Sequence, residues 1–404
     1  MPMNTFFKNV VIACIVGTSL FSTACSSDSD QPESPYQPLE LTRGEQEIVE
    51  YSNTLGYKML QVTYNQDENT IESPLSMSVA LSMLANGADG NTLLELKNVL
   101  DIQSVEELNA CIGKVLDNLS RADKKVSLSI ANSLWFDKGF KHNSEYEQQV
   151  SSCFKTDLFT MDLSSDKTMK KINTWCSDKT EGMIKNFLTM PLRNVDMALY
   201  NAMYFYGGWS EKFDRKKTTR QPFANTDGSV VQVDMMKKSK GLRNYKADDY
   251  AQTIEVPYGN GNFYLELELP VEGKTITDVL QARIDGMNPE KQDPSEIRLE
   301  LPRFSVQYKF HANTMLRAMG YTHIFNDANY SKISDIQPRL GLISQASVIE
   351  VDEEGSKAST VTGSGGVTSP GLPVVNLRFD RPFIYSIKER TNGVTLFCGV
   401  INKF

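Results

Sequence analysis

The hydrophobic residues of this chain change their spacing part-way along the sequence, and this change limits the fold more than any other feature. After Thr42, apolar residues recur at intervals of three and four, which is typical of amphipathic helices packed on a core. Between Val126 and Phe136 the interval becomes two, which is typical of a strand. Because the first third is largely helical and many later segments alternate, the sequence predicts an α+β fold.

Capping signals and further alternating runs outline the expected elements. Ser73 before Pro74 predicts a helix N-terminus. Capping boxes are expected at three places: Thr42 with Glu45, Thr92 with Glu95, and Ser104 with Glu107. Later strands are expected at residues 197–205, 252–258, 263–269, 296–301, 342–351, 374–379, 383–388 and 394–400, and helices at 171–179 and 313–319. No repeat occurs within residues 42–404 and only one loop is of low complexity, so a single large domain is expected there.

The first 24 residues have the composition of an export signal. Lys8 precedes an apolar run over residues 10–21, and small residues lead to Cys25. This run is shorter than the roughly 20 residues that span a bilayer, so residues 1–24 are expected to be a signal peptide. The segment resembles a bacterial lipoprotein leader, which implies an acylated Cys25 and an outer-membrane anchor, with the domain in the periplasm or at the cell surface. A plain secreted protein with a free Cys25 is the alternative.

The stretch after Cys25 is expected to be a flexible tether that ends at residue 41. Residues 26–38 are rich in Ser, Asp and Pro and poor in residues that build a core. Beyond it lie four further cysteines: Cys111, Cys153, Cys176 and Cys398. None belongs to a CxxC pair, so zinc or thioredoxin-like chemistry has no support and buried thiols are the preferred interpretation. An exported location would permit a disulfide, but the sequence names no partners.

Charge and motif content exclude several classes of function. The chain carries 42 Lys and Arg against 50 Asp and Glu and has no basic block, which excludes nucleic-acid and anionic-membrane-surface binders. It has three histidines and lacks G-x-S-x-G, H-E-x-x-H and phosphate-loop motifs. We therefore expect no enzymatic activity, no cofactor and no metal site. A surface hydrolase that uses Ser364 in the glycine-rich stretch is the most distant alternative.

Several segments spread over roughly 330 residues resemble the serpin family. They occur in the family's order at residues 73–92, 172–184, 201–213, 233–236, 301–304, 319–334, 350–355 and 379–385. The last of these, extended to residues 377–387, fits the C-terminal signature of the family. The resemblance implies a serpin-like fold with three mostly antiparallel sheets, eight or nine helices and an exposed reactive loop at about residues 355–372. It also implies a monomeric inhibitor that traps serine proteases, and also papain-like cysteine proteases, in a covalent 1:1 complex.

The resemblance also assigns roles to residues in and around this loop. The hinge corresponds to Glu353, Glu354, Gly355, Ser356, Ala358, Thr360 and Thr362. A hydrogen-bond cluster that controls opening of the central sheet corresponds to Ser73, Ser76, Asn201 and Gln345, where Gln345 stands in place of the usual histidine. The reactive bond falls at Thr368-Ser369, or alternatively at Val367-Thr368, because Pro370 would hinder cleavage directly after Ser369.

The sequence of the hinge shows whether its side chains could fit into a sheet as a new strand. Alternate residues of a strand face the same side, and the face that starts at Ser356 carries only small, uncharged side chains. Lys357 falls on the opposite face. This pattern favours an inhibitory serpin, and a non-inhibitory surface binding protein of the same fold is the alternative. No Lys or Arg lies between Ala358 and Leu377, which favours elastase-like or subtilisin-like targets over trypsin-like ones.

Overall fold

The computed structural model describes residues 38–294, 296–355 and 374–404. Within these ranges the chain forms eight α-helices, one short 3₁₀-helix and sixteen strands. The helices are α1 (Arg43–Thr63), α2 (Pro74–Gly87), α3 (Gly90–Leu100), α4 (Val105–Leu119), α5 (Ser144–Phe154), α6 (Asp166–Lys179), η1 (Arg215–Lys217), α7 (Ile276–Ile284) and α8 (Ala312–Ala318). The first third of the described chain is therefore mainly helical, as its periodicity predicts.

The strands account for most of the later elements. They are β1 (Thr70–Glu72), β2 (Val126–Asp137), β3 (Asp157–Met161), β4 (Met197–Gly207), β5 (Thr219–Ala224), β6 (Val230–Lys238), β7 (Arg243–Ala247), β8 (Ala251–Tyr258), β9 (Phe263–Pro270), β10 (Glu290–Lys291), β11 (Glu296–Pro302), β12 (Phe304–His311), β13 (Leu340–Val351), β14 (Val374–Arg378), β15 (Phe383–Glu389) and β16 (Thr395–Ile401). All eight later strands expected from the sequence are present. The alternation missed several others, among them β5, β6 and β12.

Three of the four predicted helix starts are confirmed. Thr42 forms a capping box, and the hydroxyls of Ser73 and Ser104 accept hydrogen bonds from the backbone of α2 and α4. At Ser104 the helix start is right but the expected capping box is half formed, because the Ser104 hydroxyl bonds the Glu107 N–H without a return bond from the Glu107 side chain. The capping box at Thr92 is wrong, because α3 already begins at Gly90 with Asp89 as its N-cap. The Thr92 hydroxyl instead accepts a hydrogen bond from the Asn329 backbone, at 2.8 Å.

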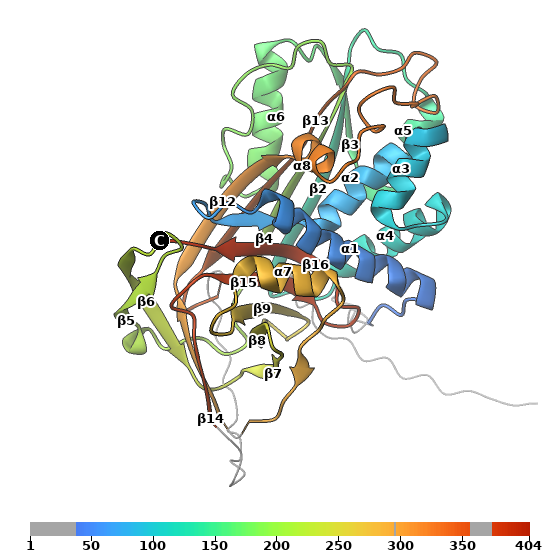
Figure 1. Ribbon diagram of the computed structural model, residues 1–404. Coiled ribbons are helices and arrows are strands. Elements are labelled where there is room, and N and C mark those ends of the chain that lie inside the picture. Colours follow the sequence, from blue (N-terminus) through green and yellow to red (C-terminus); the bar gives the residue numbers. More distant parts are fainter. Residues whose placement is uncertain (1–37, 295, 356–373) are drawn as a thin grey trace, which may run out of the picture. The chain divides into compact units, whose positions relative to one another are not determined.

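The strands form three sheets, in the mostly antiparallel arrangement that was predicted (Figure 1). A seven-stranded sheet has the order β1-β16-β15-β9-β8-β7-β10, and a four-stranded sheet the order β14-β11-β6-β5. A five-stranded sheet has the order β12-β13-β4-β2-β3. Parallel pairing occurs between β13 and β4, β2 and β3, and β11 and β14.

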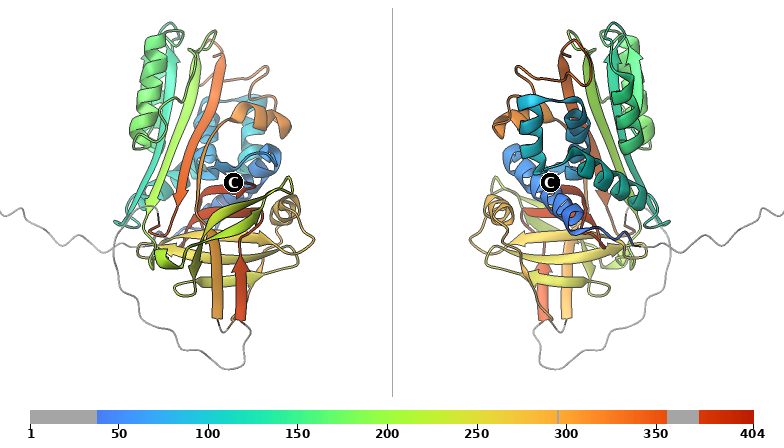
Figure 2. Two further views of the ribbon diagram at one scale, coloured as in Figure 1. Left: turned by 90° about the vertical axis from the view of Figure 1, so that its left-hand side faces the viewer. Right: turned by 90° about the vertical axis from the view of Figure 1, so that its right-hand side faces the viewer.

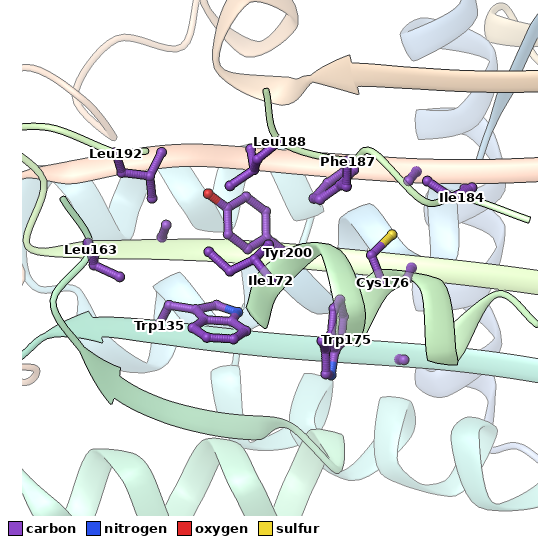
Figure 3. Packing of buried hydrophobic residues seen from close by; sticks show 14 of the residues in the cluster. Trp135, Leu163, Ile172, Trp175, Cys176, Ile184, Phe187, Leu188, Leu192 and Tyr200 are labelled. Atoms are coloured by element: carbon purple, nitrogen blue, oxygen red, sulfur yellow. The ribbon is translucent and has the colours of Figure 1, made fainter. Parts of the chain in front are cut away.

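Helices cover both faces of the five-stranded sheet (Figure 2). On one face, α2 is buried along its whole length and contacts β4, β13 and β16, so it joins this sheet to the seven-stranded one. On the other face, α6 and the segment after it pack on β2 and β4 through a cluster that includes Trp135, Trp175 and Tyr200 (Figure 3). Both faces of this sheet are therefore shielded from solvent where these helices pack.

The cysteines show no disulfide in the part of the chain that the structure describes. Cys111, Cys176 and Cys398 are buried and Cys153 is half-buried, all as free thiols. Burial raises the pKa of Cys111 and of Cys176 to about 12, so both stay protonated at neutral pH. Among the described residues there is also no group of three potential metal ligands, and none of the helices is long and apolar enough to cross a membrane.

Candidate functional site

The parallel pair β4 and β13 lies in the five-stranded sheet and separates at one end. Their pairing runs from Met197 opposite Leu340 to Tyr204 opposite Val348. The last residues of both strands, Phe205 to Gly207 and Ile349 to Val351, are not paired with each other. A cleft of about 630 Å³ opens at this end, and its lining includes residues of both strands. β4 and β13 are therefore paired along most of their length and are no longer paired where β13 ends.

This cleft is acidic. Its polar lining includes Glu350 near the end of β13, Asp352 just after this strand, and Glu181 from the turn after α6. The rings of Tyr204 and Tyr206, 6.1 Å apart, form the β4 wall. Partial burial, together with nearby Tyr206 and the carboxylates of Glu181 and Glu350, raises the pKa of Tyr204. No Lys or Arg belongs to the described lining, so the cleft suits a chain segment that carries a positive charge.

Gly355 closes a tight turn at the end of β13. Its backbone N–H and C=O pair with those of Asp352, and a second antiparallel bridge joins it to Gly208, just beyond β4. Its φ is +107°, and a Cβ at this position would lie 2.5 Å from the Gly207 oxygen and from the Trp209 nitrogen. Only glycine satisfies both conditions. Gly355 is thus held between the ends of β13 and β4.

The two glutamates before Gly355 are bound to different cations. Glu353 is 1% exposed, and its carboxylate accepts hydrogen bonds from Arg303, at 2.7 and 2.9 Å, and from the Thr218 hydroxyl, at 2.6 Å. Burial opposes ionisation, but the hydrogen bonds from Arg303 and Thr218 outweigh it and lower the pKa of Glu353. Glu354 forms an ion pair with Lys212, at 2.5 Å. Both glutamates at the base of the hinge are therefore tied to side chains outside β13.

Three of the four residues assigned to the sheet-opening cluster are joined by hydrogen bonds. The Gln345 side chain accepts from the Ser73 N–H at 2.6 Å and donates to the Ser73 oxygen at 3.0 Å. The Ser73 hydroxyl donates to that of Ser76 at 3.0 Å. Asn201 lies directly opposite Gln345 in the sheet, but its amide donates to Asn132 on β2 and does not join the others. The structure therefore ties β13 to the start of α2 through Gln345.

The remaining predicted site residues lie outside the described residues. These are Cys25, the hinge residues Ser356, Ala358, Thr360 and Thr362, and the reactive-bond residues Val367, Thr368 and Ser369. Three residues of the site, Arg303, Thr218 and Lys212, were not predicted from the sequence. Arg303 lies within the serpin-like segment 301–304, but no local sequence signal links it to Glu353.

Comparison with known proteins identifies the family. The profile described as Serpin (serine protease inhibitor) matches residues 50–403. The chain belongs to the serpin family. Iripin-8 of Ixodes ricinus is 30% identical over 385 residues, which cover 90% of this chain and 95% of Iripin-8.

Solved serpin structures share the fold. The thermophilic serpin tengpin in its native state is 26% identical, with a TM-score of 0.79, and the match covers 91% of this chain and 96% of tengpin. AtSerpin1 of Arabidopsis, in its native stressed conformation, is 23% identical, with a TM-score of 0.76 and coverage of 90% and 99%. The serpin-like α+β fold predicted from the sequence is confirmed.

Proposed function

We propose that this serpin inhibits serine proteases as a suicide substrate. The nucleophile of a protease attacks a carbonyl in the loop that follows Gly355. An acyl bond then joins the protease to the new C-terminal end, and the amine of the next residue leaves as the new N-terminus. The freed segment then enters the five-stranded sheet between β13 and β4 and carries the protease with it. The main support is that β13 and β4 are parallel neighbours that separate at one end. At this end Gly355 forms β-bridges to Asp352, just after β13, and to Gly208, just after β4.

The two bridges at Gly355 predict the register of the inserted strand. Continued along β13, the Asp352-Gly355 bridge places Lys357 opposite Glu350 and Ser359 opposite Val348. Continued along β4, the Gly208-Gly355 bridge places the same two residues opposite Tyr206 and Tyr204. Val348 and Tyr204 are themselves partners in the present sheet. Both bridges therefore lead to one register, which a new strand can adopt without a shift.

This register also assigns each hinge side chain to a face. Ala358 would lie between Ile349 and Phe205, both buried and directed to the interior. Ser356, Thr360 and Thr362 would share that face, which accepts only small side chains. Lys357 would point the other way, toward the acidic cleft. Insertion would also replace one parallel pair by two antiparallel ones, which are slightly more stable per residue.

The residues of the loop favour a particular class of target. Cleavage is expected at Thr368-Ser369, or alternatively at Val367-Thr368. Small residues at both positions fit the shallow pockets of elastase-like and subtilisin-like enzymes, and papain-like cysteine proteases form a second class. The inhibitor would act as a monomer, tethered to the outer membrane through Cys25, in the periplasm or at the cell surface.

Incubation with pancreatic elastase and with subtilisin tests this function. We expect a complex that survives denaturing electrophoresis, and mass spectrometry of the released C-terminal fragment should show Ser369 or Thr368 as its first residue. A double variant with Lys357→Ser and Ala358→Lys moves the charge to the inner face by one residue. It should be cleaved without forming a complex, because burying an unpaired charge costs several kcal/mol. Lys357→Arg is the matched control and should still form the complex.

Clean cleavage of the unmodified protein by every protease, with no complex, would contradict inhibition. It would favour the non-inhibitory binding protein. Complex formation by the double variant would contradict the predicted register instead.

A further inference from the structure

Glu72 is a buried acid that plays no part in the proposed function. It lies in β1, at the edge of the seven-stranded sheet, where it pairs with Cys398 of β16. Its side chain is fully buried. It directly precedes Ser73, the N-cap of α2 and the residue that Gln345 binds. Its position therefore links an ionisable group to the contact between α2 and β13.

Among the residues that the structure describes, the carboxyl group of Glu72 has a single hydrogen-bond partner. Its Oε1 accepts from the Thr63 hydroxyl at the end of α1, at 2.6 Å, while Oε2 has no partner within this part of the chain. Among the described residues, Glu72 takes part in no ion pair within 4.0 Å. An isolated carboxylate is very costly to bury, whereas the neutral acid is far less so.

The titratable groups around Glu72 do not supply a positive charge. Tyr308 faces it from β12, Tyr385 from β15 and Cys398 from β16, with Glu68 near Tyr308. Lys388 of β15 acts on Cys398 but forms its ion pair with Glu266, and no cation shifts the pKa of Glu72. Burial raises the pKa of Tyr308 to about 12 and those of Tyr385 and Cys398 well above their ordinary values. All three are therefore neutral near pH 7. Burial consequently raises the pKa of Glu72 from 4.5 to about 7, although the hydrogen bond from Thr63 lowers it.

Ionisation of Glu72 would act on the hydrogen bonds between Ser73 and Gln345 of β13. Both backbone groups of Ser73 bind the Gln345 side chain. A carboxylate that must reach water has to move β1 away from its neighbours, and Ser73 would move with it. β13 is the strand that must separate from β4 before another strand can enter.

We propose that Glu72 is a proton-dependent switch in the native serpin. As the neutral acid it holds the junction of β1 and α2 against β12 and β13. When ionised it loosens this junction and favours separation of β13 from β4. The effect on stability does not depend on protease inhibition, whereas the effect on strand insertion rests on the proposed function.

The direction of the pH dependence follows from linkage. The unfolded chain releases the Glu72 proton near its ordinary pKa of 4.5, and the native chain releases it near 7. The unfolded state therefore binds fewer protons between these values, and native stability falls as pH rises from about 4.5 to about 7. Above that range the loss is complete and constant.

Thermal unfolding of the full chain between pH 5 and pH 8.5 tests the switch. Glu72→Gln removes the ionisable group, so its Tm should exceed that of the unmodified protein by about 3 °C more at pH 8 than at pH 5. Glu68→Gln, an exposed acid on the turn before β1, is the matched control and should follow the unmodified profile. Taking the difference cancels the titration of all other groups. Parallel profiles for Glu72→Gln and the unmodified protein would overturn the proposal.

A second variant separates the switch from a purely structural role. Thr63→Val removes the hydrogen bond that favours the ionised form, so the pH midpoint of the effect should move upward. Infrared spectroscopy of the unmodified protein and of Thr63→Val should show a protonated carboxyl band at pH 6 that disappears at a higher pH in the variant. This readout decides the matter even if Glu72→Gln fails to fold, and absence of the band at pH 6 would overturn the proposal.

The kinetic part has its own outcome. If the protein forms protease complexes, the fraction of cleaved molecules that become trapped should differ between pH 6 and pH 8, and Glu72→Gln should remove this difference. A trapped fraction with the same pH dependence in both proteins would overturn the link to insertion. Failure to form complexes at any pH would contradict the proposed function and leave the stability profile as the test of the switch.

Discussion

Gly355 shows how a single residue directs the chain at the hinge. Its φ is positive, and three backbone atoms lie within 2.6 Å of the place that a Cβ would occupy, so every other residue is excluded. The two bridges that this close approach permits hold the start of the loop between two strands. A side chain there would force the turn out of its place and shift the register of whatever follows.

Gly355→Ala should lower the free energy of unfolding by about 3 kcal/mol or more, because the left-handed conformation costs about 1–2 kcal/mol and the collision adds to it. Urea unfolding measures the loss. Gly273→Ala is the matched control, because Gly273 also has a positive φ of 82° but no atom within 4 Å of a Cβ. The control should lose only the conformational part, and equal losses in the two variants would show that the collision at Gly355 is unimportant.

Arg303 is a single residue whose removal should destabilise the protein, because it donates to the buried carboxylate of Glu353. Arg303→Gln leaves the buried carboxylate with fewer donors and should cost about 1–2 kcal/mol at pH 7. Because the pKa of Glu353 is lowered in the native state, its contribution is present above pH 4.5 and is lost as pH falls through the lowered value. Unfolding measured from pH 7 down to pH 3 should therefore show the two proteins converging.

Arg298→Gln provides the comparison for this pair. Arg298 and its partner Glu296 are on the surface, and exposed pairs contribute little. We expect a loss in the free energy of unfolding below about 1 kcal/mol, which does not depend on the protonation of Glu353. A constant difference between Arg303→Gln and the unmodified protein across the whole pH range would argue against the carboxylate as its cause.

At the scale of elements, the Gln345 side chain hydrogen-bonds β13 to the start of α2. Gln345→Leu removes the acceptor that the buried Ser73 N–H has among the described residues, while the Ser73 oxygen keeps its bond from Met77. We expect a loss of about 2 kcal/mol in urea unfolding. Gln307→Leu, on the exposed side of the neighbouring strand β12, is the control and should be nearly neutral. A neutral Gln345→Leu would show that the sheet does not rely on this contact.

The strand register proposed for the loop gives a prediction of its own. Lys357→Glu would place two acids opposite each other, which destabilises a strand pair. It should lower the fraction of cleaved inhibitor that traps a protease, measured by gel densitometry. The double variant Lys357→Glu with Glu350→Lys should recover part of the trapped fraction at low salt and less at high salt. If the double variant is no better than the single one, these two residues are not cross-strand partners.

At the scale of the whole molecule, the proposed function requires β13 and β4, which are paired over most of their length, to separate and admit one more strand. An inserted segment of about 12 residues would add hydrogen bonds on two sides, each worth about 1 kcal/mol net. Cleavage of the loop should therefore raise the Tm by about 10 °C or more. Calorimetry before and after limited proteolysis measures this change. An unchanged Tm would indicate that the loop stays outside the sheet, as in a non-inhibitory member of the fold.

Part of the site could be predicted and part could not, for physical reasons. Ser73 was recognisable because an N-cap involves residues three positions apart. The wrong start at Thr92 arose because Asp89 and Gly90 compete for the same helix end, and the hydroxyl of Thr92 finds a better partner at Asn329. The apolar residues Tyr146, Val150 and Phe154 recur every four positions in α5, which was a usable helix signal that the sequence-based prediction did not include.

The sequence by itself determined the α+β class, the starts of three helices, nine of the sixteen described strands, and the small side chains at alternate hinge positions. These properties depend on neighbours a few residues apart. Only the tertiary structure decided that Glu353 meets Arg303, that Asn201 turns toward Asn132 instead of Gln345, and that Glu72 is buried with no ion-pair partner among the described residues. Their partners and surroundings come from distant segments, and the free energy of a polar group depends on what surrounds it after the chain has packed.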